Sequence, residues 1–166
     1  MSRGRFFRVA GAVPPCAVAD PMRNAQAIIT LAKQAAQRRV AVVAFPELCL
    51  TGYTARDLFL DNTLKTAVDD ALEFLVEQSK HVETTLIIGC PLESVHRMYN
   101  TAVVIAQGCI LGVVPKRFMP RSAEFEETRW FRSGDDLLER EMLLCGFTVP
   151  FGIDLIFRDG HSASRS

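Results

Sequence analysis

The amino-acid sequence predicts an α/β fold, and two observations carry that prediction. Between residues 6 and 90, apolar runs typical of buried strands alternate with segments whose apolar residues recur at helical spacing. After residue 100, shorter apolar runs follow one another across glycine-containing connections, which are typical of hairpins. The alternating first part indicates crossover units and a largely parallel sheet.

The first strand is predicted at residues 6–13, before Pro14-Pro15. A helix over about 21–38 follows, because Asp20 suits the N-cap and Pro21 suits the first helical position, where its missing N–H is not needed. Helical spacing places six apolar residues of this segment on one face: Ala25, Ile28, Ile29, Ala32, Ala35 and Ala36.

The next strand, residues 40–45, has no polar alternation and is expected to be covered on both faces. A second amphipathic helix is predicted over 62–80, and a third strand over 85–90, ending at Pro91. We expect both strands in the interior of the sheet and both helices on one of its faces.

Two strands at 101–106 and 109–114 are joined by Gln107-Gly108, where glycine permits a positive φ. Residues 115–136 are irregular, charged and aromatic, as in a long functional loop with some helix. Two more short strands are predicted at 142–145 and 148–157. We therefore expect one domain over residues 1–157, followed by a disordered polar tail at 158–166.

The composition excludes several classes of partner. Nineteen basic and nineteen acidic residues cancel, so no global field favours nucleic acid or a membrane. No apolar run approaches the roughly 20 residues of a membrane-spanning helix, no signal peptide is recognised, and a cytoplasmic location is expected.

The cysteines are odd in number, widely spaced and without a CxxC pair, which disfavours a disulfide framework or a zinc site. Cys16 stands apart, whereas four others lie in or beside apolar runs and are predicted to be small buried residues: Cys49, Cys90, Cys109 and Cys145.

Three residues near strand ends could carry chemistry. Glu47 follows the apolar strand that Pro46 stops, and ligands of open α/β sheets gather at such carboxyl ends. It could be a general base or a cap of the next turn. Lys116 could stabilise an oxyanion or simply be a solvated lysine. Tyr53, after Gly52, could fold back over the same strand end or belong to the core.

The acidic part of the long loop contains Phe125 and Glu127, and taken alone it is typical of an ion-paired surface. None of the three histidines lies near an acid–nucleophile pattern. A nucleotide-binding fold is disfavoured, because no GxGxxG follows the first strand.

Taken together, several segments resemble the nitrilase, or carbon–nitrogen hydrolase, superfamily: FPELCLTGY (45–53), YNTAVVI (99–105), GVVPKRFMP (112–120) and the Phe125-x-Glu127 step. The RDLFL tract and FGIDLIF (151–157) resemble in particular the N-terminal glutaminase domain of glutamine-dependent NAD synthetases. The resemblance implies a nitrilase-type α-β-β-α sandwich, of which this chain would hold only the N-terminal portion.

The resemblance also implies roles for particular residues. In the family's Glu–Lys–Cys triad, Glu47 would be the general base and Lys116 would stabilise the oxyanion. Glu127 resembles the second glutamate, which hydrogen-bonds the lysine region and positions substrate. Tyr53 and Phe125 would line the glutamine pocket.

Two departures from the family pattern stand out. Ser122 occupies a place where the family often has a tyrosine, and no cysteine occurs where the nucleophile is expected. We therefore expect a truncated and inactive chain. The parent would pass ammonia from glutamine to a synthetase domain, where ATP and magnesium would bind; no cofactor or metal is expected in this domain. A homo-oligomer is expected. The alternatives are a stand-alone nitrilase-family amidase or carbamoylase, or a non-catalytic module.

Overall fold

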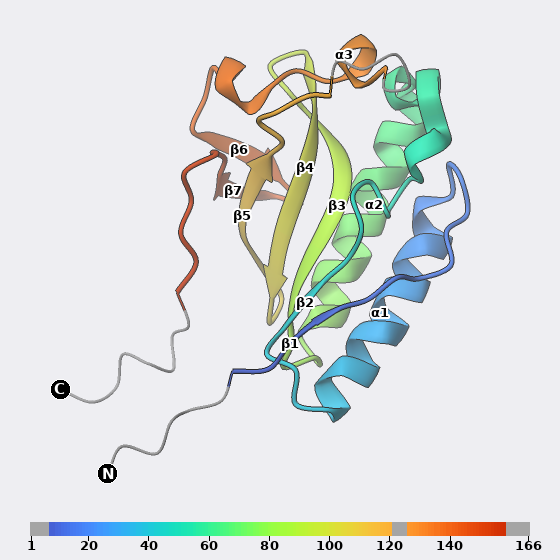
Figure 1. Ribbon diagram of the computed structural model, residues 1–166, viewed down its shortest axis with the longest axis vertical. Helices are drawn as coiled ribbons and strands as arrows, with labels where there is room; N and C mark the ends of the chain where they lie inside the picture. The colour runs from blue at the N-terminus through green and yellow to red at the C-terminus, as the bar shows by residue number, and fades with distance from the viewer. Residues whose placement is uncertain (1–6, 121–125, 159–166) are drawn as a thin grey trace, which may run out of the picture.

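A mixed β-sheet with two helices on one face forms the centre of the computed structural model, which describes residues 7–120 and 126–158 (Figure 1). The helices are α1 (Pro21–Gln37) and α2 (Asn62–Ser79), and they contact each other along the same side of the sheet. The prediction of both helices on one face is therefore confirmed.

The sheet has the strand order β1-β2-β3-β4-β5, with bounds Val9–Gly11, Val42–Ala44, Thr85–Ser94, Arg97–Ala106 and Cys109–Pro115. Strands β1, β2 and β3 run parallel to one another, whereas β4 is antiparallel to both of its neighbours, β3 and β5. Strands β2 and β3 are interior, as predicted. The expectation of a largely parallel sheet holds only for β1 to β3, because consecutive hairpins supply the other strands.

Both long helices begin at a capping aspartate, and the sequence predicted the first of these, Asp20. Asp20 Oδ1 accepts from the backbone N–H of Arg23 at 3.2 Å, with Pro21 at the first helical position. Asp61 Oδ1 accepts from Thr63 N at 2.7 Å and caps α2. The inner face of α2 includes Leu72, which is fully buried and contributes about 1.5–3 kcal/mol of apolar burial.

Strand β3 continues through Pro91 to Ser94, so the predicted end at Pro91 is wrong. Pro91 lies opposite Asn100 of β4. The Asn100 carbonyl points towards β5, where it accepts from Lys116 N at 2.7 Å, so Pro91 and Asn100 form a pair without hydrogen bonds between them. The missing N–H of Pro91 would have pointed away from β4, so the hairpin loses no hydrogen bond.

Of the two hairpin turns in the main sheet, the sequence predicted one and not the other. Gln107 and Gly108 have φ values of +48° and +80°, which confirms the predicted β4–β5 hairpin. The β3–β4 turn places Val95 and His96 at +48° and +58°. A β-branched residue rarely adopts a positive φ, which is why this turn was not predicted.

A second, two-stranded sheet consists of β6 (Glu141–Leu144) and β7 (Phe147–Pro150). The predicted strand over 148–157 is thus too long, since only Phe151 forms a further single bridge, to Val113. In the sequence between β5 and β6, the irregular segment contains α3 (Glu127–Trp130) and the 3-10 turn η2 (Gly134–Asp136), as expected of a loop with some helix. Residues 159–166 of the expected tail lie outside the described residues.

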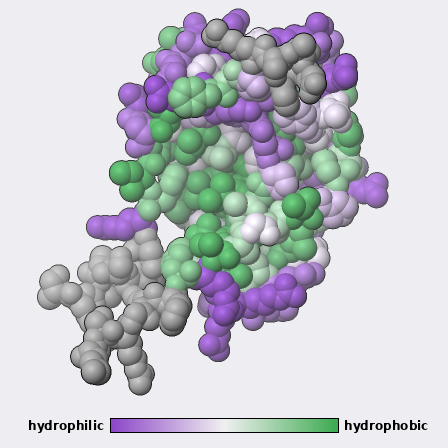
Figure 2. Space-filling model, viewed as in Figure 1, coloured by the Kyte–Doolittle hydropathy of each residue, from purple (hydrophilic) through white to green (hydrophobic). Residues whose placement is uncertain are grey.

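Apolar side chains also remain on the surface of the sheet. Figure 2 shows them gathered over the sheet between β5 and β1, and Val9 and Leu111 are 64% and 42% exposed. Within the described ranges, no helix is long and apolar enough to cross a membrane.

The cysteines divide by burial. Cys49 and Cys90 are buried as predicted, and Cys145 is half-buried. Cys109 is exposed, contrary to the prediction, because it opens β5 on the side of the strand that alternation directs outward. Burial raises the pKa of the Cys49 thiol to about 11 and raises that of Cys90 as well.

We expect the thiols to react in this order. At about pH 8, a disulfide reagent such as dithionitrobenzoate should modify Cys16 and Cys109 first and Cys145 more slowly. Cys49 and Cys90 should react only after unfolding in denaturant. Rapid modification of Cys49 in the folded protein, located by peptide mass, would contradict its buried position.

Candidate active site

Three charged side chains meet where β2 and β5 end. Lys116 Nζ lies 2.7 Å from Glu47 Oε1, and 2.9 Å from both carboxylate oxygens of Glu127. Glu47 and Lys116 are 69 residues apart in the sequence, so only the fold brings them together. The predicted convergence of Glu47 and Lys116 is confirmed, as is the approach of Glu127.

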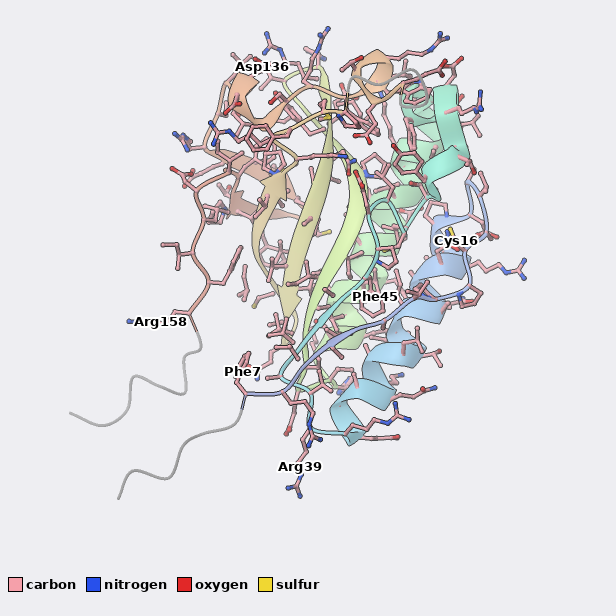
Figure 3. All side chains as sticks on the ribbon, viewed as in Figure 1. Phe7, Cys16, Arg39, Phe45, Asp136 and Arg158 are labelled. Carbon is pink, nitrogen blue, oxygen red and sulfur yellow. The ribbon has the colours of Figure 1, made fainter. Side chains whose placement is uncertain are left out.

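Glu47 is held in place by the close approach of its loop to β3. Phe45, labelled in Figure 3, marks the end of β2, and the chain then crosses directly over Gly89. A Cβ atom at Gly89 would lie 2.5 Å from Leu48 N and 2.8 Å from Glu47 Cα. Leu48 has a φ of +51°, and Leu50 N donates to Gly89 O at 3.1 Å. Only glycine at this position of β3 leaves room for the loop.

Asn100 is a further member of the cluster. Its side-chain amide donates to Glu47 Oε1, and its carbonyl accepts from Lys116 N, so it contacts both residues. It is 2% exposed. Sequence reasoning missed Asn100, although a polar residue between strand-forming neighbours was an available signal, because buried polar groups need partners.

The main chain of Lys116 is fixed on both sides, since its carbonyl also accepts from Gly134 N at 2.9 Å. Burial lowers the pKa of Lys116, but hydrogen bonds to Glu47 and Glu127 outweigh this and raise its pKa overall. The ammonium therefore stays charged at neutral pH. Such a fixed positive charge can stabilise an anionic oxygen.

Glu127 is a buried carboxylate, 2% exposed, on the four-residue helix α3. Tyr53 Oη and Lys116 Nζ both donate to it, which offsets the cost of removing a charge from water. Burial raises the pKa of Tyr53, and the hydrogen bond to Glu127 raises it further. Tyr53 therefore remains a protonated donor.

The cluster is open to solvent on one side, because Glu47 is 43% exposed and Tyr53 is 39% exposed. A molecule could thus reach the carboxylate of Glu47 and the ammonium of Lys116 from the same side. Phe125, the other expected pocket residue, lies outside the described residues.

No thiol takes part in this cluster within the described part of the chain, which contains all five cysteines. Cys49 donates to Gly89 O at 3.5 Å, and Cys90 pairs with Thr101. Over residues 7–120 and 126–158, no group of three or more His, Cys, Asp or Glu residues is arranged to hold a metal ion.

A family model described as carbon-nitrogen hydrolase matches residues 8–149. This chain belongs to the carbon–nitrogen hydrolase family. Within the family, it is 42% identical over 153 residues to the glutamine-dependent NAD(+) synthetase of Mycobacterium tuberculosis (strain H37Rv). The match covers 92% of this carbon–nitrogen hydrolase chain but 22% of that relative.

Solved structures of carbon–nitrogen hydrolase relatives give the same fold. The glutamine-dependent NAD(+) synthetase of Cytophaga hutchinsonii superimposes with a TM-score of 0.81 and 27% identity, over 92% of this chain and 26% of that one. A nitrilase-superfamily amidase of Nesterenkonia AN1 superimposes with a TM-score of 0.69 and 22% identity, over 86% and 52% of the two chains. The nitrilase-type fold, represented by its N-terminal portion, is therefore confirmed.

We predict that Gly89→Ala displaces the Glu47 loop. The added Cβ would collide with backbone atoms, which cannot rotate away, so the free energy of unfolding should fall by about 1–3 kcal/mol. Urea unfolding measures this loss. Gly11→Ala in β1 is the matched control, because a Cβ there meets nothing within 4 Å. Equal stability of the two variants would show that the loop does not rest on Gly89.

A second prediction concerns the buried charge of Glu127. Lys116→Met should lower the free energy of unfolding by about 3 kcal/mol, because it leaves a buried carboxylate without its ion-pair partner. Adding Glu127→Gln should recover part of that loss. Lys80→Met is the control, since Lys80 pairs with Glu77 at the surface and should change stability by less than about 1 kcal/mol. A double variant no more stable than Lys116→Met would contradict this coupling.

Proposed function

We propose that this chain carries the base and the oxyanion-binding lysine of a glutaminase site in a glutamine-dependent NAD(+) synthetase. The observation that carries the proposal is the convergence of Glu47, Lys116 and Glu127 within a carbon–nitrogen hydrolase fold. Its support from relatives is the 42% identity to the mycobacterial synthetase, of which the chain spans 22%.

In the proposed reaction, Glu47 accepts the proton of a cysteine thiol, and the thiolate attacks the side-chain amide carbon of glutamine. The carbonyl oxygen becomes an anion, which the Lys116 ammonium stabilises. The protonated Glu47 returns the proton to the departing nitrogen, so ammonia leaves and a thioester forms. Water, deprotonated by Glu47, then releases glutamate and restores the thiol.

Glu127 and Tyr53 would serve the same site without exchanging protons. Glu127 orients Lys116, and the Tyr53 hydroxyl fixes one Glu127 oxygen. We further propose that Tyr53 and Phe125 line the pocket for glutamine, where Tyr53 presents its partly exposed ring.

The proposed reaction needs a thiol within reach of Glu47, and none of the five cysteines has that position. We therefore propose that a polypeptide of these 166 residues alone does not hydrolyse glutamine. Removing the nucleophile of a catalytic triad leaves at most about 10³–10⁴-fold of the acceleration.

The wider assignment follows from the same relatives. The ammonia would pass to a synthetase domain of the parent protein, which would bind ATP and magnesium, while this domain would need neither. Cytoplasmic NAD(+) synthesis is the proposed setting. We also propose that the chain forms homo-oligomers, supported by the apolar side chains left on the sheet, including Val9 and Leu111 (Figure 2).

A chimera tests the proposed function. This chain's 153 matched residues would replace the aligned segment of the Mycobacterium tuberculosis relative, which keeps the rest of its own sequence. We expect the chimera to release ammonia from glutamine. Glu47→Gln should then lower kcat/KM by about 10²–10⁴-fold, because a general base contributes that much.

The control for the chimera is Glu77→Gln, which changes a surface carboxylate that pairs with Lys80. A folded chimera that hydrolyses other amides or carbamoyl compounds, but not glutamine, would favour the amidase or carbamoylase alternative. Unchanged turnover in Glu47→Gln would rule out Glu47 as the base.

A further inference from the structure

A carboxylate outside the charged cluster holds α3 against the neighbouring 3-10 segment η1 (Tyr53–Leu60). Asp57 Oδ1 accepts from Arg129 Nε and from Trp130 Nε1, each at 2.8 Å, and Oδ2 accepts from Arg129 Nη2 at 3.0 Å. All three donors belong to α3, so one side chain of η1 engages two consecutive residues of this helix. We call this set of contacts the Asp57 clamp.

Helix α3 needs such external support. It has four residues, far fewer than an isolated helix needs to be stable, yet it carries the buried Glu127. Aromatic contacts supply part of the support, because the Phe59 ring lies 5.7 Å from Trp130 and 4.9 Å from Phe131, measured between centroids. These ring contacts support the C-terminal end of α3.

Hydrogen bonds join η1 to α3 at two separate places. Tyr53, at the start of η1, donates to Glu127, and Asp57, beyond the kink at Arg56, accepts from Arg129 and Trp130. Two attachments on different residues fix the rotation of a short helix about its own axis, which a single attachment cannot do. That rotation decides whether the Glu127 carboxylate faces Lys116.

We propose that Asp57 is a positioning residue, which sets the orientation of Glu127 towards Lys116 and Tyr53 through its hydrogen bonds to Arg129 and Trp130. The relevance of this orientation to catalysis rests on the proposed function, but the orientation itself does not.

The clamp acts locally. The side chains of Asp57 and Arg129 are 66% and 61% exposed, and exposed ion pairs add little to global stability. Hydrogen bonds from Trp130 and Arg129 lower the pKa of Asp57, so it is ionised at neutral pH. Loss of Asp57 should therefore loosen α3 without unfolding the chain.

Three variants of the 166-residue chain test the proposal. Asp57→Ala removes every acceptor of the clamp, whereas Asp57→Asn keeps one oxygen that can accept from both Arg129 Nε and Trp130 Nε1. Asp154→Ala is the matched control, because it removes a similarly exposed carboxylate that pairs with Arg140 elsewhere. Far-UV circular dichroism checks that each variant is folded.

The first reading is the environment of α3. Trp130 is the only tryptophan, so its indole N–H resonance and its fluorescence report on the clamp directly. Asp57→Ala should shift both and should accelerate hydrogen exchange of the Arg129 and Phe131 amides, which bond to Glu126 and Glu127, by about tenfold. Asp57→Asn should give an intermediate result.

The second reading distinguishes positioning from a merely structural contact. Burial raises the pKa of Tyr53 most, and Glu127 and Glu47 raise it further; Lys116 contacts both of these carboxylates. If α3 turns away, Tyr53 loses its Glu127 partner, and its titration should move to lower pH in Asp57→Ala but not in Asp154→Ala. The Tyr53 ring resonances separate it from Tyr99.

Two outcomes would overturn the proposal. One is an Asp57→Ala variant that matches Asp154→Ala in every reading. The other is a change at Trp130 with an unaltered Tyr53 titration, which would show that Asp57 does not act on Glu127. Failure of the proposed glutaminase function would appear in the chimera alone and would leave these readings unchanged.

Discussion

The Lys116 ammonium is the charge on which the geometry of the site depends. It lies between the carboxylates of Glu47 and Glu127, which would otherwise repel each other across a short distance. Glu127 is almost completely buried, and its negative charge is tolerable there because Lys116 and Tyr53 both donate to it. Hydrogen bonds to the same two carboxylates outweigh the effect of burial and raise the pKa of Lys116, so the ammonium stays charged.

The backbone brings these charges together through two different devices. At β2, the absence of a side chain on Gly89 lets the Glu47 loop lie directly on β3. At β5, the antiparallel pairing with β4 continues into Lys116, whose N–H bonds to Asn100. Asn100 then contacts Glu47 with its side chain, which links the two strand ends across the sheet. Glu127 differs, because a short helix on η1 positions it rather than a strand.

The chain's membership of the carbon–nitrogen hydrolase family and the geometry of the cluster support one another. The family match covers residues 8–149, and within that span the fold brings Glu47 and Lys116, which follow two strand ends, into contact. The buried thiols of Cys49 and Cys90 have other partners, and burial keeps both in the unreactive protonated form. The contact between Glu47 and Lys116 is thus formed without the participation of Cys49 or Cys90.

Local signals in the sequence determined helix α1 with its Asp20 cap, the amphipathic helix α2 and the Gln107-Gly108 hairpin. They also placed Glu47 and Lys116 after apolar strands, since caps, periodicity and turns act over a few residues. The resemblance to the family added their expected contact. Only the tertiary structure decided that β3 continues through Pro91 and that Val95-His96 forms a turn, because strand partners override local preference. It also decided that Asn100 joins the cluster and that Asp57 binds α3. These contacts join residues 53 to 73 positions apart, and no local pattern encodes such a pairing.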